Sequence, residues 1–360
     1  MNASKKKNKF NMVKHELKQN QGAQPNNGAD MDSLTPIIGG SVHNELNSRK
    51  YPKCYLIGNF QEPIFIPISD ELFKQVRLAK KNLSATILIE HAYNYAMENY
   101  LEFEREILHA TAHDLVFTMR DEEEYRNISH NIGRRIENHL STIRSYRDIS
   151  KKLTSAIFGR KSKEYIAHCV SFDKALTSSK YYAVVENLRN YSQHVGKVFT
   201  NLIFKGNWID IDDANSKLRR MLVPQLSVDT LRKDRNNKPP VSEMKSGQII
   251  DLREYIRGHL EIMWEIHSGL RNRHKDHLLE WEATIESISE MYLSHSNSEK
   301  SLDQKLLGLQ IYQWFPKSKD LEIVEELHRP YLFSYKQLIA KNQTLVHLRK
   351  RYVSNELGTE

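Results

Sequence analysis

Arg189, Asn190 and His194 are the residues whose types and spacing best suit chemistry on a phosphate backbone. RNA carries its own nucleophile, the 2′-hydroxyl, so cleavage requires a general acid or base that works near neutral pH. It also requires a cation that stabilises charge on the phosphoryl oxygens. Histidine supplies the first group, and the planar fork of arginine supplies the second.

The local pattern predicts that these residues lie in the last turns of a helix ending near Gly196. On an ideal helix Asn190 and His194 share a face because they are four residues apart, whereas Arg189 lies off that face on a long stem. Arg–His pairs at similar spacing occur three more times: Arg134 with His139, Arg253 with His259, and Arg271 with His277. Only the last of these also has a polar residue, Asn272, directly after the arginine.

The run Arg189-Asn190-Tyr191-Ser192-Gln193-His194 resembles the active-site signature of the HEPN superfamily. The resemblance covers this helix alone. It implies an all-helical, metal-independent endoribonuclease with Arg189, Asn190 and His194 as catalytic residues. It further implies a homodimer with two motifs facing one cleft, products with 2′,3′-cyclic phosphate and 5′-hydroxyl ends, and no cofactor. Many members act in toxin or phage-defence systems, so an antitoxin or a defence-system partner protein is also expected.

Hydrophobic periodicity predicts a mainly α protein, a helical bundle with a small β-rich insertion and a disordered basic N-terminal tail. A short hairpin is expected near residues 55–68, with Pro224 marking an edge strand of the later insertion. The four Trp, including Trp208, are assigned to packing. The predicted regions are a tail (1–50), a helical region with the N-terminal hairpin (51–195), the β-rich insertion and linker (196–247) and a C-terminal helical region (248–360). The predicted helices include one that yields to the next near 82–84, and others near 125–157, 163–176, 181–192, 249–288, 302–314 and 319–346.

Composition limits the function classes. The 360 residues contain 53 Lys and Arg against 45 Asp and Glu, a net charge of +8 that favours phosphate-bearing partners such as RNA. No run approaches the about 18 apolar residues of a membrane span, and no apolar signal core follows the basic N-terminus, so we expect a cytoplasmic protein without membrane contact. Two cysteines are too few for a disulfide framework. Glycine-rich phosphate loops and the acyl-hydrolase elbow are missing, which argues against nucleotide-driven and acyl-hydrolase chemistry.

Other signals favour plainer explanations. Glu-x-x-His spacings suit a di-metal site, but surface polarity of helices explains them better: Glu106 with His109, next to His113, and Glu325 with His328. Basic clusters are candidates for an RNA groove, although such clusters are more often solvated faces: Arg219-Arg220, Arg232-Lys233, Arg271 to His277, and Arg349 to Arg351. The alternative function is a non-catalytic helical interaction module that binds nucleic acid or a partner protein, in which residues 189–194 merely end a helix.

Overall fold

The computed structural model describes most of the chain from residue 54 to residue 353. The described ranges are 54–58, 65–117, 121–194, 196–209, 216–232, 241–295, 308–315, 317–318, 320–327, 334–342 and 345–353. The predicted tail (1–50) lies outside them. The chain divides into two units, one joining residues 1–53 to 314–322 and the other made of residues 54–313 and 323–360. The helices and apolar cores below belong to the second unit.

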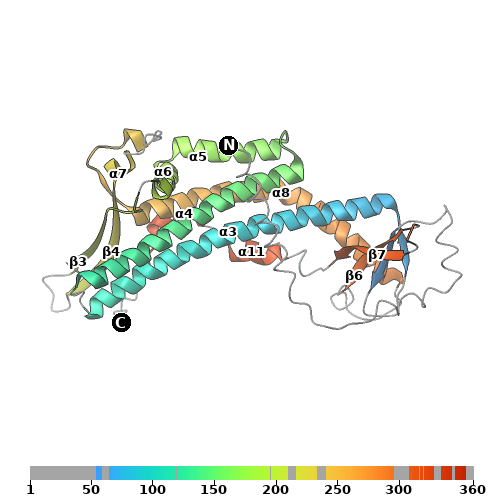
Figure 1. The fold of residues 1–360 in the computed structure, drawn as a ribbon, viewed down its shortest axis with the longest axis horizontal. Helices are drawn as coiled ribbons and strands as arrows, with labels where there is room; N and C mark the ends of the chain where they lie inside the picture. The colour runs from blue at the N-terminus through green and yellow to red at the C-terminus, as the bar shows by residue number, and fades with distance from the viewer. Residues whose placement is uncertain are drawn as a thin grey trace, which may run out of the picture. The chain divides into compact units, whose positions relative to one another are not determined.

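Two long antiparallel helices pack against each other in this unit (Figure 1): α3 (Asp70–Phe117) and α4 (Glu122–Phe158). The side chain of Asp121 caps α4 by accepting a hydrogen bond from the backbone N–H of Glu124 at 2.7 Å. At the other end, Gly159 takes a positive φ of 89° and ends the helix.

The predicted interruption near 82–84 is wrong, because α3 runs through it without a break. Asn82 is buried there, and its backbone carbonyl accepts the hydroxyl of Thr86 one turn later. The polar residues therefore lie inside the helix, where Leu83 and Ile87 fill an apolar core.

Three further helices pack on this pair: α5 (Lys163–Ser178), α6 (Lys180–His194) and α8 (Leu252–His295). The helices predicted near 163–176 and 181–192 are confirmed with small shifts of their ends. One apolar cluster joins α3, α4, α6 and α8 to the β insertion, and a second joins α3 to α4, α5 and α8. The protein is mostly helical, with small antiparallel sheets.

Two ion pairs, one with a buried carboxylate and one partly buried, fix the register between α3 and α8. Arg271 holds Glu90 through Nε and Nη2, at 2.9 and 2.6 Å. Arg257 holds Glu104 in the same two-pronged way, with both distances 2.8 Å. The two glutamates and the two arginines are each fourteen residues apart, as expected for antiparallel helices that keep one contact face over four turns.

The same two arginines also bind the C-terminal segment, which follows α11 (Tyr335–Lys341). Nη1 of Arg271 donates to the backbone carbonyl of Asn342, and Nη1 of Arg257 donates to that of Arg351. Each guanidinium thus ties together α3, α8 and the end of the chain.

The predicted β insertion is present, but one detail is wrong. Its sheet has the order β3 (Asn201–Ile209), β4 (Lys217–Ser227), β5 (Ile249–Asp251), so β4 is the central strand and not an edge. Pro224 has no backbone N–H to donate to a neighbouring strand. Strand β5 pairs with β4 only at residues 225–227, so no hydrogen bond to β5 is lost at Pro224. The short helix α7 (Val228–Arg232) follows β4. Residues 249–251, expected to start a helix, form β5 instead.

A second antiparallel sheet has the order β2-β1-β6-β7. The predicted hairpin near 55–68 is confirmed as β1 (Cys54–Gly58) and β2 (Ile66–Ile68). The two helices predicted near 302–314 and 319–346 are wrong. Most of the described residues in this stretch form two strands, β6 (Leu309–Phe315) and β7 (Asp320–Leu327). Among these described residues, only the short α11 is helical. Among the described residues, no helix is both long and apolar enough to cross a bilayer.

Candidate active site

Helix α6 carries the candidate residues Arg189, Asn190 and His194 at its C-terminal end. Its buried side packs into the largest core, which fixes the axis of the helix. The helix ends at His194, and the N–H of Gly196 donates back to the carbonyl of Tyr191 at 3.3 Å. A Cβ at Gly196 would lie 3.0 Å from the Tyr191 hydroxyl, so glycine suits this close turn. The predicted helix end is confirmed.

Arg189 is partly buried and forms no ion pair with a carboxylate among the residues that the structure describes. Its Nη1 donates to Oδ1 of Asn190 at 2.9 Å, and its buried Nε has no hydrogen-bond partner within the described chain. Burial, and then the charge of nearby Arg144, lower the pKa of Arg189.

Two carboxylates lie close to Arg189, but both bind other arginines. Glu186 pairs with Arg147 at 2.9 Å, and Asp148 pairs with Arg144 at 3.0 Å. The guanidinium of Arg189 therefore keeps its positive charge available for an anion.

His194 is exposed in the last turn of α6 and makes no hydrogen bond or ion pair to any residue that the structure describes. Asn190 lies one turn before it on the same face. Arg189 and His194 are five residues apart, so their Cα–Cβ bonds diverge by about 140° around the helix. The structure brings Arg189 and Asn190 into contact but shows no contact between His194 and either of them.

The three other Arg–His pairs lack this combination of a free guanidinium and an accessible imidazole. His139 and His259 are fully buried. Burial lowers the pKa of His139 to about 4, and burial also lowers the pKa of His259. Arg271, which precedes His277, is held by Glu90.

The basic cluster on α8 divides between the interior and the surface: Lys275 is exposed, whereas Arg271 is paired with buried Glu90. The carboxylate of Glu90 is buried between Arg271 and His267, with its Oε2 3.2 Å from His267 Nε2. Burial alone would raise the pKa of Glu90, but its interactions with His267 and then with Arg271 lower it to about 2. Nδ1 of His267 lies 2.9 Å from the hydroxyl of Tyr146, which extends the network into α4.

Sequence reasoning missed this network. Its one signal in the sequence is a glutamate at position 90, flanked by Ile87, Ile89 and Tyr93 on the buried side of α3. A charge on an apolar helix face indicates a buried partner. The sequence does not indicate which arginine that partner is.

Other basic residues expected to contact RNA are also engaged with the protein. Arg220 binds Asp114 at 2.6 Å, and Arg349 binds Glu261 at 2.7 Å. Trp208, assigned to packing, is instead 59% exposed on β3.

The described members of the Glu–His spacings contact other partners. Glu106 faces Arg135, and His113 lies 3.1 Å from Glu124. Glu325 pairs with two cations of α3, while its partner His328 lies outside the described residues. Within the part of the chain that the structure describes, no three His, Cys, Asp or Glu side chains are grouped to hold a metal ion.

A comparison of the chain with protein-family models, with curated proteins and with solved structures found no match. The function is therefore inferred from the chemistry and geometry of the chain's own residues.

Proposed function

We propose that this protein is a metal-independent, HEPN-like endoribonuclease with Arg189, Asn190 and His194 as its catalytic residues. One observation carries the proposal. All four Arg–His pairs compared above lie in the described part of the chain. Only the pair at the end of α6 combines a guanidinium that has no carboxylate partner among the described residues with an exposed imidazole. An anion is the natural partner for the uncompensated charge of Arg189.

In the proposed reaction, the 2′-oxygen of a ribose attacks the adjacent phosphorus while an imidazole accepts the hydroxyl proton. The bond from phosphorus to the 5′-oxygen then breaks, and that oxygen receives a proton from a general acid. The products carry a 2′,3′-cyclic phosphate and a 5′-hydroxyl. Arg189 stabilises the charge on the non-bridging oxygens. Asn190, whose Oδ1 accepts from Arg189, donates its amide N–H groups to no described residue and can donate them to phosphate.

The scheme needs an acid and a base, but each chain offers one histidine at this site. His194 also projects from a different side of α6 than Arg189. A homodimer that faces two copies of the α6 end across one cleft supplies both histidines. The antitoxin or defence partner, and the toxin or phage-defence role itself, stay predictions from the resemblance.

The test is cleavage of single-stranded RNA by the full chain in the presence of EDTA. We expect His194→Ala to reduce the rate by about 100-fold or more, because positioned acid–base groups contribute about 10²–10⁴. Arg189→Ala should cause a similar loss. His295→Ala is the matched control, since His295 is another exposed histidine in the last turn of a helix, α8.

Cleavage that is equal in wild type, His194→Ala and Arg189→Ala would refute the proposal. Circular dichroism and sedimentation must show that the variants keep the fold and the oligomeric state of the wild type. End-group analysis supplies a second check, because a 3′-hydroxyl with a 5′-phosphate would contradict attack by the 2′-oxygen.

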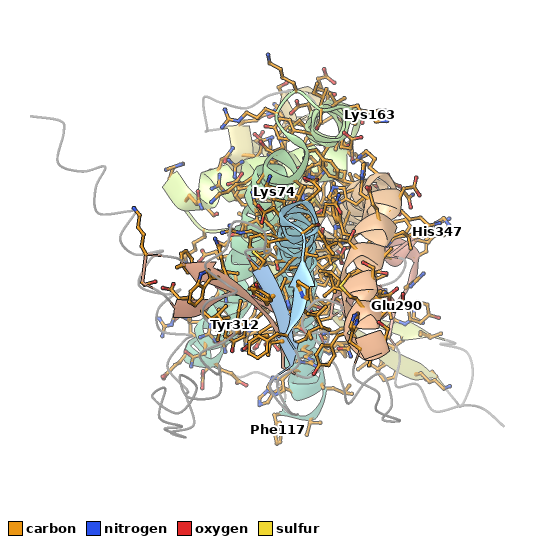
Figure 2. The ribbon with its side chains drawn as sticks, turned by 90° about the vertical axis from the view of Figure 1, so that its right-hand side faces the viewer. Lys74, Phe117, Lys163, Glu290, Tyr312 and His347 are labelled. Atoms are coloured by element: carbon orange, nitrogen blue, oxygen red, sulfur yellow. The ribbon has the colours of Figure 1, made fainter. Side chains whose placement is uncertain are left out.

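A separate observation favours the alternative, a non-catalytic interaction module. Leu101, Leu108 and Leu115 are 45–56% exposed at seven-residue spacing on α3. Phe117 at the end of the same helix is 66% exposed and its side chain protrudes (Figure 2). Such a stripe is typical of a face that binds another helix. Under this alternative RNA is never cut, and Leu108→Glu weakens assembly with the partner.

A further inference from the structure

Strand β3 forms an open edge of the sheet in the β insertion. The sheet has the order β3-β4-β5, so within the described chain β3 pairs with β4 on one side and with no strand on the other (Figure 1). At nine residues β3 is long for an edge strand, and the N–H and C=O groups along an open edge invite pairing with another chain. Its sequence contains no proline and a single charge, at Lys205.

Tyr125 on α4 shows which backbone groups of β3 face the open side. The N–H of Leu202 donates to the Tyr125 hydroxyl at 3.3 Å, and that hydroxyl donates to the carbonyl of Leu202 at 3.1 Å. The backbone groups of Leu202 therefore point away from β4. Successive residues of an antiparallel pair alternate in this respect, and the register between β3 and β4 is unbroken along the whole strand. Phe204, Gly206 and Trp208 thus present their N–H and C=O groups at the open side.

These three residues are spaced symmetrically about Gly206. Two copies of β3 that lie antiparallel, with Gly206 opposite Gly206, also place Phe204 of each copy opposite Trp208 of the other. Each of these pairs exchanges two hydrogen bonds, so this register uses every outward backbone group of the three residues. Tyr125 already binds the preceding outward position, Leu202, and so limits the paired segment to residues 204–208.

The side chains of this segment fit the same pairing. Trp208 is 59% exposed, although it lies on the face of the sheet from which Leu202 and Phe204 reach the largest core. Cross-strand neighbours share a face, so Trp208 of each copy would lie beside Phe204 of the other, and aromatic pairs of this kind stabilise antiparallel sheets. The strand therefore supplies both an exposed ring and the neighbour that covers it, which favours a second copy over an unrelated extended peptide.

The charges on β3 and β4 are compatible with this contact. Lys205 lies on the opposite face from Trp208 and faces Asn207 of the second copy, so no two cations are directly opposite each other. On the Trp208 face, Arg220 of β4 covers Gly206, where a Cβ would lie 3.0 Å from its Nη1. Nη2 of Arg220 lies 2.6 Å from the carboxylate of Asp114 on α3, so the cation that covers Gly206 is already paired.

We propose that the open edge of β3 binds β3 of a second copy of this chain, antiparallel and centred on Gly206. The three strands of each copy then form one six-stranded sheet across a two-fold axis. Antiparallel pairing places the two Asn201 residues, which follow the α6 ends in the chain, at opposite ends of the paired segment. The contact therefore differs from the α6 contact of the proposed active site and does not depend on that proposal.

The first test is sedimentation equilibrium of the full chain over a range of concentrations. Wild type should associate reversibly. Gly206→Pro should weaken this association at least tenfold, because proline removes the N–H at the centre of the contact but none that bonds to β4. Trp208→Ser should weaken it about tenfold. Ile249→Ser is the matched control, since Ile249 is an exposed apolar residue on β5, at the other edge of the same sheet, and it should change nothing.

A disulfide cross-link tests the register directly. Opposite Cα atoms of a hydrogen-bonded antiparallel pair lie about 5.5 Å apart, within the range of about 4.4–6.8 Å that a disulfide spans. Gly206→Cys should therefore give a covalent dimer on mild oxidation, whereas Ile249→Cys should not. Both variants also carry Cys169→Ser, which removes the partly exposed natural thiol.

Three results would overturn the proposal: a wild-type chain that stays monomeric at every concentration, association that Gly206→Pro and Trp208→Ser leave unchanged, or equal cross-linking of Gly206→Cys and Ile249→Cys. Circular dichroism must show that each variant keeps the fold. If Gly206→Pro does not fold, Trp208→Ser and the cross-link decide, because Trp208 is an exposed side chain and the cysteine meets only the end of the flexible Arg220 side chain.

Discussion

The buried carboxylate of Glu90 provides the sharpest test of how the helices are held together. Its side chain is 3% exposed and meets Arg271 at two points and His267 at a third. Glu90→Gln keeps the shape of the side chain but removes the negative charge. The guanidinium of Arg271, whose side chain is 17% exposed, then lies almost buried without a counter-charge.

The pKa of Glu90 is lowered from 4.5 to about 2 by His267 and Arg271, so the folded protein favours the ionised form of this carboxylate. Measurements on other proteins show that removing one partner of a buried pair costs about 3–5 kcal/mol. We therefore expect Glu90→Gln to lower the free energy of unfolding by about 3 kcal/mol at pH 7.

Urea denaturation followed by circular dichroism measures this difference. Because the folded-state pKa of Glu90 is lowered, its contribution is complete above the unfolded value near 4.5 and disappears as the pH falls toward about 2. The gap between wild type and Glu90→Gln should close over that range.

Glu104→Gln is the matched control, since Glu104 holds Arg257 with the same geometry. That pair is more exposed, with side chains 14% and 22% accessible, so we expect a smaller loss of about 1–2 kcal/mol. A loss of less than about 1 kcal/mol in Glu90→Gln, or equal losses in the two variants, would contradict a stabilising role of the buried charge. Replacing Glu90 by Leu and Arg271 by Met in the same protein should recover most of the stability, because neither charge of the pair is then left buried.

Three further outcomes are expected. Burial lowers the pKa of His139 from 6.5 to about 4, so the free energy of unfolding should fall as the pH drops from 6.5 toward 4, and less so in His139→Leu, as read by urea denaturation at stepped pH. Gly258→Ala should lower the free energy of unfolding by about 2 kcal/mol, because the added Cβ would lie 2.6 Å from the side chain of Tyr181. Gly133→Ala, where the nearest atom lies 3.6 Å from the added Cβ, should raise that free energy by up to about 1 kcal/mol. A calorimetric melt that ranks the two variants in the opposite order would contradict the packing. Asp121→Ala should lower stability by about 1 kcal/mol through loss of the α4 cap, and an unchanged melting temperature would argue against that hydrogen bond.

Helices with one dominant apolar stripe could be predicted from the sequence. α4 has such a stripe, a cap at Asp121 and a stop at Gly159, and its predicted and observed bounds agree closely. Local signals suffice where the periodicity and both ends indicate the same element.

Prediction failed where a local signal was ambiguous. The polar residues near 82–84 suggested a break, but no glycine or proline stands there and tertiary packing kept α3 continuous. The strand β6 contains Ile311, Tyr312 and Trp314, a β-branched and aromatic composition that short apolar runs share with buried helices.

The candidate site was predictable in its residue types but not in its electrostatics. The sequence places Arg189 and His194 at a helix end. It does not show that Glu186 forms an ion pair with Arg147. Nor does it show that Arg271 forms one with Glu90, which is 181 residues away along the chain. Pairing over such separations depends on the packing of whole helices.

The matched fourteen-residue spacing of the two arginines on α8 and of the two glutamates on α3 makes the helices intolerant of length changes. One residue inserted into α8 between Arg257 and Arg271 would turn one guanidinium about 100° away from its carboxylate and shift it by about 1.5 Å. A compensating insertion in α3 would have to fall between Glu90 and Glu104. An insertion in one of these two helices therefore requires an insertion of equal length in the facing segment of the other, or one of the two ion pairs is lost.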